Sequence, residues 1–200
     1  DFTINAIVLQ TNGTYFDPHG GRLDILAKKI KAVGNGKDRI LEDPLRMLRA
    51  ARFASQLDFE VDPNLIGVMR QHAYEITRVS KERWIVELDK LLMGKDPVNL
   101  MKYMIPEVWL VWKNSWAELA FTEAIEKGGG YDLNTKKKVV EDTVDERWRY
   151  LLYHIGFPYA GVKKNDEYKY PKHEVIRREL LLGICARLKF SNERTKHLLQ

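Results

Sequence analysis

The chain has 200 residues, 44% of them hydrophobic and 30% charged, which excludes an intrinsically disordered protein and gives enough length for a sizeable core. Its net charge of +5 and pI near 9.1 permit a polyanionic partner without requiring one. No apolar run approaches the roughly 18 residues of a membrane helix, and no signal peptide is expected. Cys185 is the single cysteine, so an internal disulfide is impossible and a cytoplasmic location is expected.

The first residues of the chain predict a small β structure. Residues 2–10 suggest a helical turn that leads into a strand, and Thr11-Asn12-Gly13 supplies a turn before a partner strand at 14–16. A short helix is expected at 23–29 and a last strand at 31–33. A hairpin followed by one short helix is therefore predicted for this part of the chain.

From residue 41 to the end, the sequence predicts helices. Asp62 followed by Pro63 is a typical helix start, with a capping residue and proline at the first helical position. Residues 159–171 are polar and rich in lysine, and are expected to form a loop. The expected helices cover 41–57, 62–76, 80–93, 96–105, 115–127, 137–156, 172–188 and 191–199.

Three arginines recur every three residues in a segment that is otherwise nearly all apolar: Arg46, Arg49 and Arg52. A solvated charged face is the ordinary explanation, but the apolar flanks favour a mostly buried helix whose narrow polar strip opens onto a cleft. Arginine rather than lysine at each position suits forked recognition of phosphate or of base edges. Glu42 and Asp43 precede Arg46 by four and three residues, so both are expected to brace its guanidinium.

Asp43 and Arg46 together could also read a nucleobase. A carboxylate accepts a hydrogen bond from an exocyclic amine, and a guanidinium donates to a ring nitrogen or a carbonyl. Adenine and cytosine both present an amine beside a ring-nitrogen acceptor, whereas guanine and uracil arrange their donors and acceptors differently. The pair could therefore select adenine and cytosine.

Four segments in chain order carry a family resemblance. They resemble motifs of the class II tRNA nucleotidyltransferases, which are CCA-adding enzymes, and of the closely similar bacterial poly(A) polymerases. The match covers about the first half of the chain. The segments are Asp1 to Ala6 (DFTINA), Asp17 to Asp24 (DPHGGRLD), Glu42 to Ala54 (EDPLRMLRAARFA) and Ser80 to Leu88 (SKERWIVEL).

The resemblance implies a mainly α fold in three parts. Residues 1–40 would be the C-terminal part of an α+β nucleotidyltransferase head, with the hairpin as its remnant here. Residues 41–105 would form a helical neck that carries the nucleobase-reading helix, and 106–200 a helical body and tail. Since the chain begins at Asp1 without methionine, it is expected to be the C-terminal part of a longer product.

The resemblance also implies roles for particular residues. Asp43 and Arg46 match the protein template that pairs with ATP or CTP, in agreement with their hydrogen-bonding groups. Arg49 and Arg52 are expected to contact the triphosphate, although one of them could instead brace the fold. The remaining positions are Asp1 and Asn5, which match the ribose contacts, and Glu42, Asp17, Arg22 and Arg83, which are expected to support the site.

No catalytic residue and no metal ligand is expected in this chain. Enzymes of this family use two Mg²⁺ ions held by an Asp-x-Asp pair, and no such pair stands here in the right context. The resemblance therefore implies a partner, an N-terminal head fragment that carries the pair. Without that fragment the chain is expected to be inactive.

The function expected from these observations is addition of CCA to tRNA from CTP and ATP, by two-metal phosphoryl transfer. A poly(A) polymerase and a noncatalytic RNA-binding chain stay open as alternatives. A distant third is a metal-dependent HD phosphohydrolase, because residues 151–158 resemble a degraded HD motif in which Tyr153 and His154 replace the metal pair. Lysine and arginine clusters at 136–138, 163–164 and 172–178 could contact tRNA phosphates.

Overall fold

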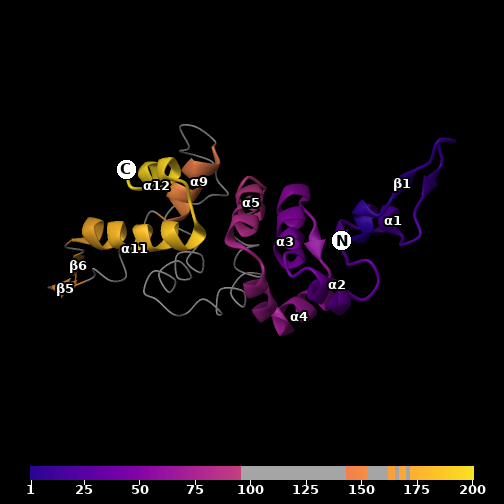
Figure 1. Cartoon of the computed structure of the whole chain (residues 1–200), viewed down its shortest axis with the longest axis horizontal. Helices are drawn as coiled ribbons and strands as arrows, with labels where there is room; N and C mark the ends of the chain where they lie inside the picture. Colours follow the sequence, from indigo (N-terminus) through magenta and orange to yellow (C-terminus); the bar gives the residue numbers. More distant parts are fainter. Residues whose placement is uncertain (96–142, 153–161, 165–166, 170–171) are drawn as a thin grey trace. The chain divides into compact units, whose positions relative to one another are not determined.

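The structure is a computed structural model, which describes residues 1–95, 143–152, 162–164, 167–169 and 172–200 (Figure 1). The chain divides into two compact units, Asp1–Asp96 and Pro97–Gln200. The described elements are mainly helical, as the sequence predicts, with a few short strands. The expected helices at 96–105 and 115–127, and the HD-like residues Tyr153 and His154, lie outside the described residues.

The predicted hairpin is present near the start of the chain. A 3₁₀ turn, η1 (Thr3–Asn5), leads into β1 (Val8–Leu9), which pairs antiparallel with β2 (Tyr15–Phe16). Gly13 lies in the connecting turn with φ of +80°, a backbone conformation that glycine adopts without steric cost. The hairpin is confirmed.

The helix expected at 23–29 begins and ends earlier, as α1 (Gly21–Leu26). The Asp17 carboxylate explains the early start, because it accepts hydrogen bonds from the backbone N–H of Gly21 at 2.8 Å and of Arg22 at 2.9 Å. These are N–H groups of the first helical turn, which have no partner within the helix. Asp17 thus fixes the loop to the helix that follows it.

The prediction of a strand at 31–33 is wrong. The strand that forms is β3 (Lys29–Ile30), which pairs in parallel with β4 (Glu60–Val61), and the sequence did not predict β4. Residue Ala32 instead makes an isolated antiparallel bridge with Phe2. β3 and β4 have only two residues each, which is too short for an alternating apolar pattern to be recognised in the sequence. Each also depends on a partner strand some 30 residues away in the chain.

The single helix expected at 41–57 is broken at its head. The structure has α2 (Gly36–Glu42) and α3 (Arg46–Leu57) on either side of the break. Pro44 has no N–H, and the proline ring forces the preceding residue out of the helical region. Asp43 accordingly has φ −140° and ψ 98°, which is extended backbone. The Asp43–Pro44 pair separates the two helices.

The rest of the first unit is formed by α4 (Pro63–Gln71), η2 (Ala73–Arg78) and α5 (Lys81–Leu92). The Asp62 cap is confirmed, since its side chain accepts from the N–H of Asn64. The turn expected as the end of the 62–76 helix is 3₁₀ rather than α. Helices α3 and α5 pack against each other, and the buried Ser55 of α3 donates to the backbone carbonyl of Leu91 at 2.9 Å.

The described part of the second unit contains α9 (Val144–Leu151), α11 (His173–Leu188) and α12 (Asn192–Leu198). A loop was expected at 159–171, but the structure has an antiparallel hairpin there, formed by β5 (Val162–Lys164) and β6 (Glu167–Lys169). The C-terminal part of the chain is therefore not entirely helical. Each strand contains one residue type that favours strands, Val162 in β5 and Tyr168 in β6.

Two buried side chains mark the core of the second unit. Trp148 is fully buried, with its ring edge-on to Phe190 at 5.2 Å between centroids. The thiol of Cys185 is buried, and burial raises its pKa, so it stays protonated at neutral pH. Trp109, Trp112 and Trp116 lie outside the described residues.

A glycine at the start of α1 permits a close backbone approach that can be tested. A Cβ added at Gly21 would lie 2.1 Å from the carbonyl oxygen of Thr3, a backbone atom that cannot rotate away. We expect Gly21→Ala to lower the free energy of unfolding by about 1–3 kcal/mol. Gly67→Ala in α4, where a Cβ would meet nothing within 4 Å, is the matched control and should be neutral or stabilising. Urea unfolding measures both; equal effects would contradict the close approach.

Candidate functional site

The arginine stripe of α3 meets the first residue of the chain. The Asp1 carboxylate accepts from Arg46 Nε at 2.9 Å and also pairs with Arg49. Next to it, the ring of Phe2 is fully buried and packs edge-on against Phe53 of α3, with centroids 5.7 Å apart. The segment of the first motif is thus fixed to the helix of the third motif by one ion-pair cluster and one aromatic contact.

Arg46 is held on two sides. Its Nη1 donates across the helix break to Glu42, the expected partner, at 2.6 Å, and to the backbone carbonyl of Arg39 at 2.7 Å. The side chain is 13% exposed. A guanidinium held by two carboxylates and a carbonyl has a fixed orientation, which suits recognition of a planar ligand.

At the C-terminal end of the arginine stripe, the charge of Arg52 is balanced by Glu87, which the sequence analysis did not identify as a partner. Glu87 of α5 is buried, with a side chain 6% exposed, and lies 2.9 Å from Arg52 Nε and 3.8 Å from Arg49 Nη1. Arg52 is also stacked on Phe53, its guanidinium carbon 4.0 Å from the ring centroid. Burial lowers the pKa of Arg52, and Glu87 opposes that shift. These contacts give Arg52 the geometry of a brace for the fold.

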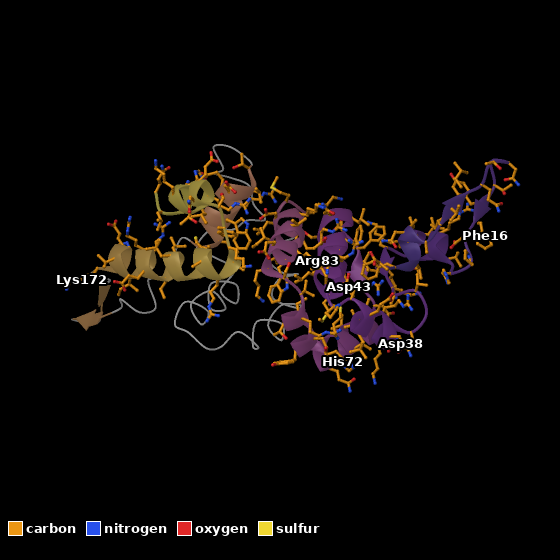
Figure 2. All side chains as sticks on the ribbon, in the orientation of Figure 1. Phe16, Asp38, Asp43, His72, Arg83 and Lys172 are labelled. Atoms are coloured by element: carbon orange, nitrogen blue, oxygen red, sulfur yellow. The ribbon has the colours of Figure 1, made fainter. Side chains whose placement is uncertain are left out.

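The expectation that Asp43 braces Arg46 is wrong. The Asp43 carboxylate instead accepts from Arg83 Nη2 of α5 at 2.9 Å and from the backbone N–H of Leu45 at 3.2 Å (Figure 2). The reason is the helix break at Pro44, which turns Asp43 out of the helical register that the i, i+3 spacing assumes. The carboxylate of Asp43 and the guanidinium of Arg46 therefore have separate partners.

Asn5 organises the turn around the first motif. Its side-chain oxygen accepts from the backbone N–H of Phe2 at 3.0 Å. The backbone N–H of Thr3 donates to the carbonyl of Lys31, and the N–H of Val33 to that of Asp1. Of the two expected ribose contacts, Asn5 is the last residue of the 3₁₀ turn η1, and Asp1 lies just before that turn. Asn5 itself is exposed.

The second motif contributes structure at the other side of this turn. Asp24 is 5% exposed and binds Thr3 Oγ1 at 2.7 Å and Lys31 Nζ at 2.6 Å. The guanidinium of Arg22 lies 5.2 Å from the ring centroid of Tyr15 in the hairpin. Asp17 and Arg22 therefore support the loop and the hairpin rather than the arginine stripe.

The Asp24 cluster predicts a dependence of stability on pH. Burial alone would raise the pKa of Asp24, but hydrogen bonds from Lys31 and Thr3 outweigh it and hold the pKa below its ordinary 3.8. A carboxyl with a depressed folded-state pKa stabilises fully above the unfolded value, and that stabilisation is lost as pH falls through the folded pKa. We expect the urea midpoint to fall from about pH 5 downward, and less steeply in Asp24→Asn. Identical acid profiles would contradict this role.

Within the described ranges no group of three or more His, Cys, Asp or Glu side chains could hold a metal ion. No helix among those residues is long and apolar enough to cross a membrane. The site is thus an alternating set of arginines and carboxylates at the meeting of η1, α2, α3 and α5. What it offers a ligand is a set of oriented guanidinium and carboxylate groups.

Comparison with known proteins finds matches both to the sequence and to the fold. A family profile described as "Probable RNA and SrmB- binding site of polymerase A" matches residues 58–108. A Bacillus stearothermophilus CCA-adding enzyme, solved in complex with CTP, has a TM-score of 0.62 at 26% identity, over 99% of this chain and 49% of that one. A tRNA-processing enzyme solved with CTP has a TM-score of 0.61 at 21% identity, over 98% and 50%, and shares the fold.

Curated relatives specify the resemblance further. The CCA-adding enzyme of Limosilactobacillus reuteri is 45% identical over 105 residues, which are 52% of this chain and 26% of that protein. That of Levilactobacillus brevis is 45% identical over 97 residues, 48% of this chain and 24% of the relative. The matched segment thus spans about a quarter of these relatives. These matches confirm the resemblance to the class II CCA-adding and poly(A) polymerase family.

Proposed function

We propose that this chain supplies the nucleotide-recognising and RNA-binding part of an RNA 3′-terminal nucleotidyltransferase that adds CCA to tRNA. One observation carries the proposal: Asp1, from the segment that matches the ribose-contact motif, pairs directly with Arg46 and Arg49 of the base- and phosphate-recognising helix. Motifs far apart in the sequence thus meet at one point. Relatives at 45% identity are CCA-adding enzymes, which supports the same assignment.

The residues divide the recognition of CTP and ATP among them. Asp43 and Arg46 would pair with the amine and the ring nitrogen of the base, and Asp1 and Asn5 would contact the ribose. Arg49 is the better candidate for the triphosphate, because its side chain is 29% exposed against 11% for Arg52. Asp1 occupies the guanidinium groups that the nucleotide would use, so binding requires Asp1 to turn from arginine toward ribose.

The metal-dependent step is assigned to a partner segment. The sequence contains no Asp-x-Asp pair, so in this proposal the ions would be held by side chains of another segment. In enzymes of two-metal type, the ions align the attacking hydroxyl and stabilise the leaving pyrophosphate. We propose a head segment that carries the Asp-x-Asp pair and works together with this chain.

The hairpin offers a surface for that head segment. Its apolar side chains are strongly exposed, which is costly in water and typical of a surface that another segment covers. A two-stranded hairpin is also marginally stable without further strands. The exposed residues of the hairpin and of α1 beside it are Val8 (54%), Leu9 (62%), Tyr15 (58%), Phe16 (53%), Leu23 (71%) and Leu26 (81%).

RNA binding is proposed for residues 58–108 and for the second unit. The matched family description names RNA binding for the former range. In the second unit Lys172 and Arg178 are exposed and suit phosphate contacts, whereas the guanidinium of Arg177 donates to the backbone carbonyl of Leu198 at 3.1 Å. A single buried thiol, Cys185, fits a cytoplasmic enzyme.

A poly(A) polymerase is the second candidate, because the description of the matched family profile names polymerase A.

A 3′-extension assay distinguishes a CCA-adding enzyme from a poly(A) polymerase. The 200-residue chain, with and without a supplied head segment that carries Asp-x-Asp, is mixed with tRNA lacking its CCA end and with CTP and ATP singly and together.

The assay has three informative outcomes. Addition that stops after CCA, and that needs both nucleotides and the head segment, is the expected result. Unlimited addition from ATP alone would instead establish a poly(A) polymerase. No extension with the head segment present, together with retained RNA binding, would contradict the catalytic assignment and leave a noncatalytic RNA-binding chain.

A further inference from the structure

We infer that Arg83 is a positioning residue that sets which nucleobases the Asp43 carboxylate accepts. The inference deepens the proposed function and rests on it. It goes beyond general support of the neck, because it assigns to one side chain on α5 an effect on base choice.

The geometry around Asp43 gives each carboxylate oxygen one fixed donor. Oδ1 accepts from the backbone N–H of Leu45 at 3.2 Å, and Oδ2 accepts from Arg83 Nη2 at 2.9 Å. The Asp43 side chain is 31% exposed and that of Arg83 53% exposed. An ionised carboxylate has about four acceptor positions, so both oxygens keep capacity for a further donor.

The backbone by itself does not fix this carboxylate. Asp43 lies at the break between α2 and α3 with extended dihedral angles, outside any helix that would restrict its side chain. The contact to Leu45 is local and long. The contact to Arg83 comes from 40 residues further along the chain and ties the break to α5. Removing Arg83 therefore leaves the carboxylate free to rotate about a single weak hydrogen bond.

The consequence falls on base discrimination. A carboxylate held in one orientation accepts from the exocyclic amine of adenine or cytosine, and it repels the carbonyl oxygen that guanine or uracil presents at the equivalent position. A carboxylate that rotates can move away from that carbonyl, so the repulsion is lost. Arg83 thereby acts on the base through Asp43 and needs no contact with the nucleotide itself.

The test compares ATP with GTP, because the two carry the same ribose and triphosphate and differ only in the base. Dissociation constants for each are measured by NMR titration of the 200-residue chain, with CTP and UTP as a second pair. In Arg83→Ala we expect the GTP-to-ATP ratio of dissociation constants to fall by about 3–10-fold. Arg83→Lys keeps the charge without the fork and should give an intermediate ratio.

Two controls separate positioning from folding. Arg78→Ala removes an exposed arginine of the same unit that pairs with Glu75 rather than with Asp43, and it should leave the ratio unchanged. In an Asp43→Asn background, Arg83→Ala should change the ratio no further, because its effect passes through the carboxylate. Both arginine pairs are exposed, so thermal unfolding should shift little in either variant.

The outcomes distinguish this inference from the function on which it rests. If the unsubstituted chain prefers ATP and Arg83→Ala keeps the full ratio, the positioning role is overturned while the base-reading function stands. The same holds if Arg83→Ala still lowers the ratio in the Asp43→Asn background. If the unsubstituted chain binds ATP and GTP equally, both the base-reading function and the role of Arg83 are overturned.

Discussion

Replacing Glu87 by alanine is expected to lower the free energy of unfolding of the first unit by about 3 kcal/mol or more. Glu87 is buried and pairs with Arg52, whose side chain is only 11% exposed. Its removal would leave a buried guanidinium without a counter-charge, which is costlier than the pair itself is stabilising. Urea unfolding followed by far-ultraviolet circular dichroism measures the change.

Two variants make this expectation specific. Glu87→Gln keeps the shape and one acceptor oxygen, and should destabilise less than Glu87→Ala. Glu75→Ala breaks the exposed pair with Arg78 and should cost no more than about 1 kcal/mol. If Glu87→Ala were as mild as Glu75→Ala, the buried pair would not brace α3 against α5.

The second large effect is expected on nucleotide choice. Arg46→Ala should reduce the preference for ATP over GTP by about 1–3 kcal/mol, between about 5- and 150-fold, because the guanidinium that reads the ring nitrogen is lost. The measurement is the pair of dissociation constants for ATP and GTP, obtained by NMR titration of the same chain.

Arg39→Ala is the matched control for Arg46→Ala. Arg39 pairs with the same carboxylate, Glu42, at 3.0 Å, but it lies on α2 outside the arginine stripe. Its backbone carbonyl, which Arg46 uses, is retained in the variant. Arg39→Ala should therefore leave the preference intact. Equal losses in the two variants would mean that general positive charge, rather than Arg46, sets the preference.

Local signals in the sequence were sufficient for several elements of the fold. The Thr11-Asn12-Gly13 turn predicted the hairpin and the Asp62–Pro63 cap predicted the start of α4. The helices expected at 80–93 and 172–188 are present as α5 and α11. Each of these depends on residues within one turn or a few positions. The contact between Glu42 and Arg46 was also predicted correctly, although it joins the end of α2 to the start of α3 across the break rather than two residues of one helix.

Long-range contacts could not be predicted in this way. The pairing of β3 with β4, of Arg52 with Glu87 and of Asp43 with Arg83 each joins segments at least 30 residues apart. The break at Asp43–Pro44 had a local signal, the proline itself. The surrounding helical pattern outweighed it in the prediction, although proline excludes its predecessor from the helix.

The most direct test of a base-reading site maps where nucleotides bind on this chain. Backbone amide shifts are recorded by NMR while ATP, CTP, GTP and UTP are added separately. We predict that ATP and CTP shift amides of residues 1–5 and 43–52, and that GTP and UTP shift them less at equal concentration. Shifts that are the same for all four nucleotides, or that lie away from both segments, would contradict a base-reading site at Asp43 and Arg46.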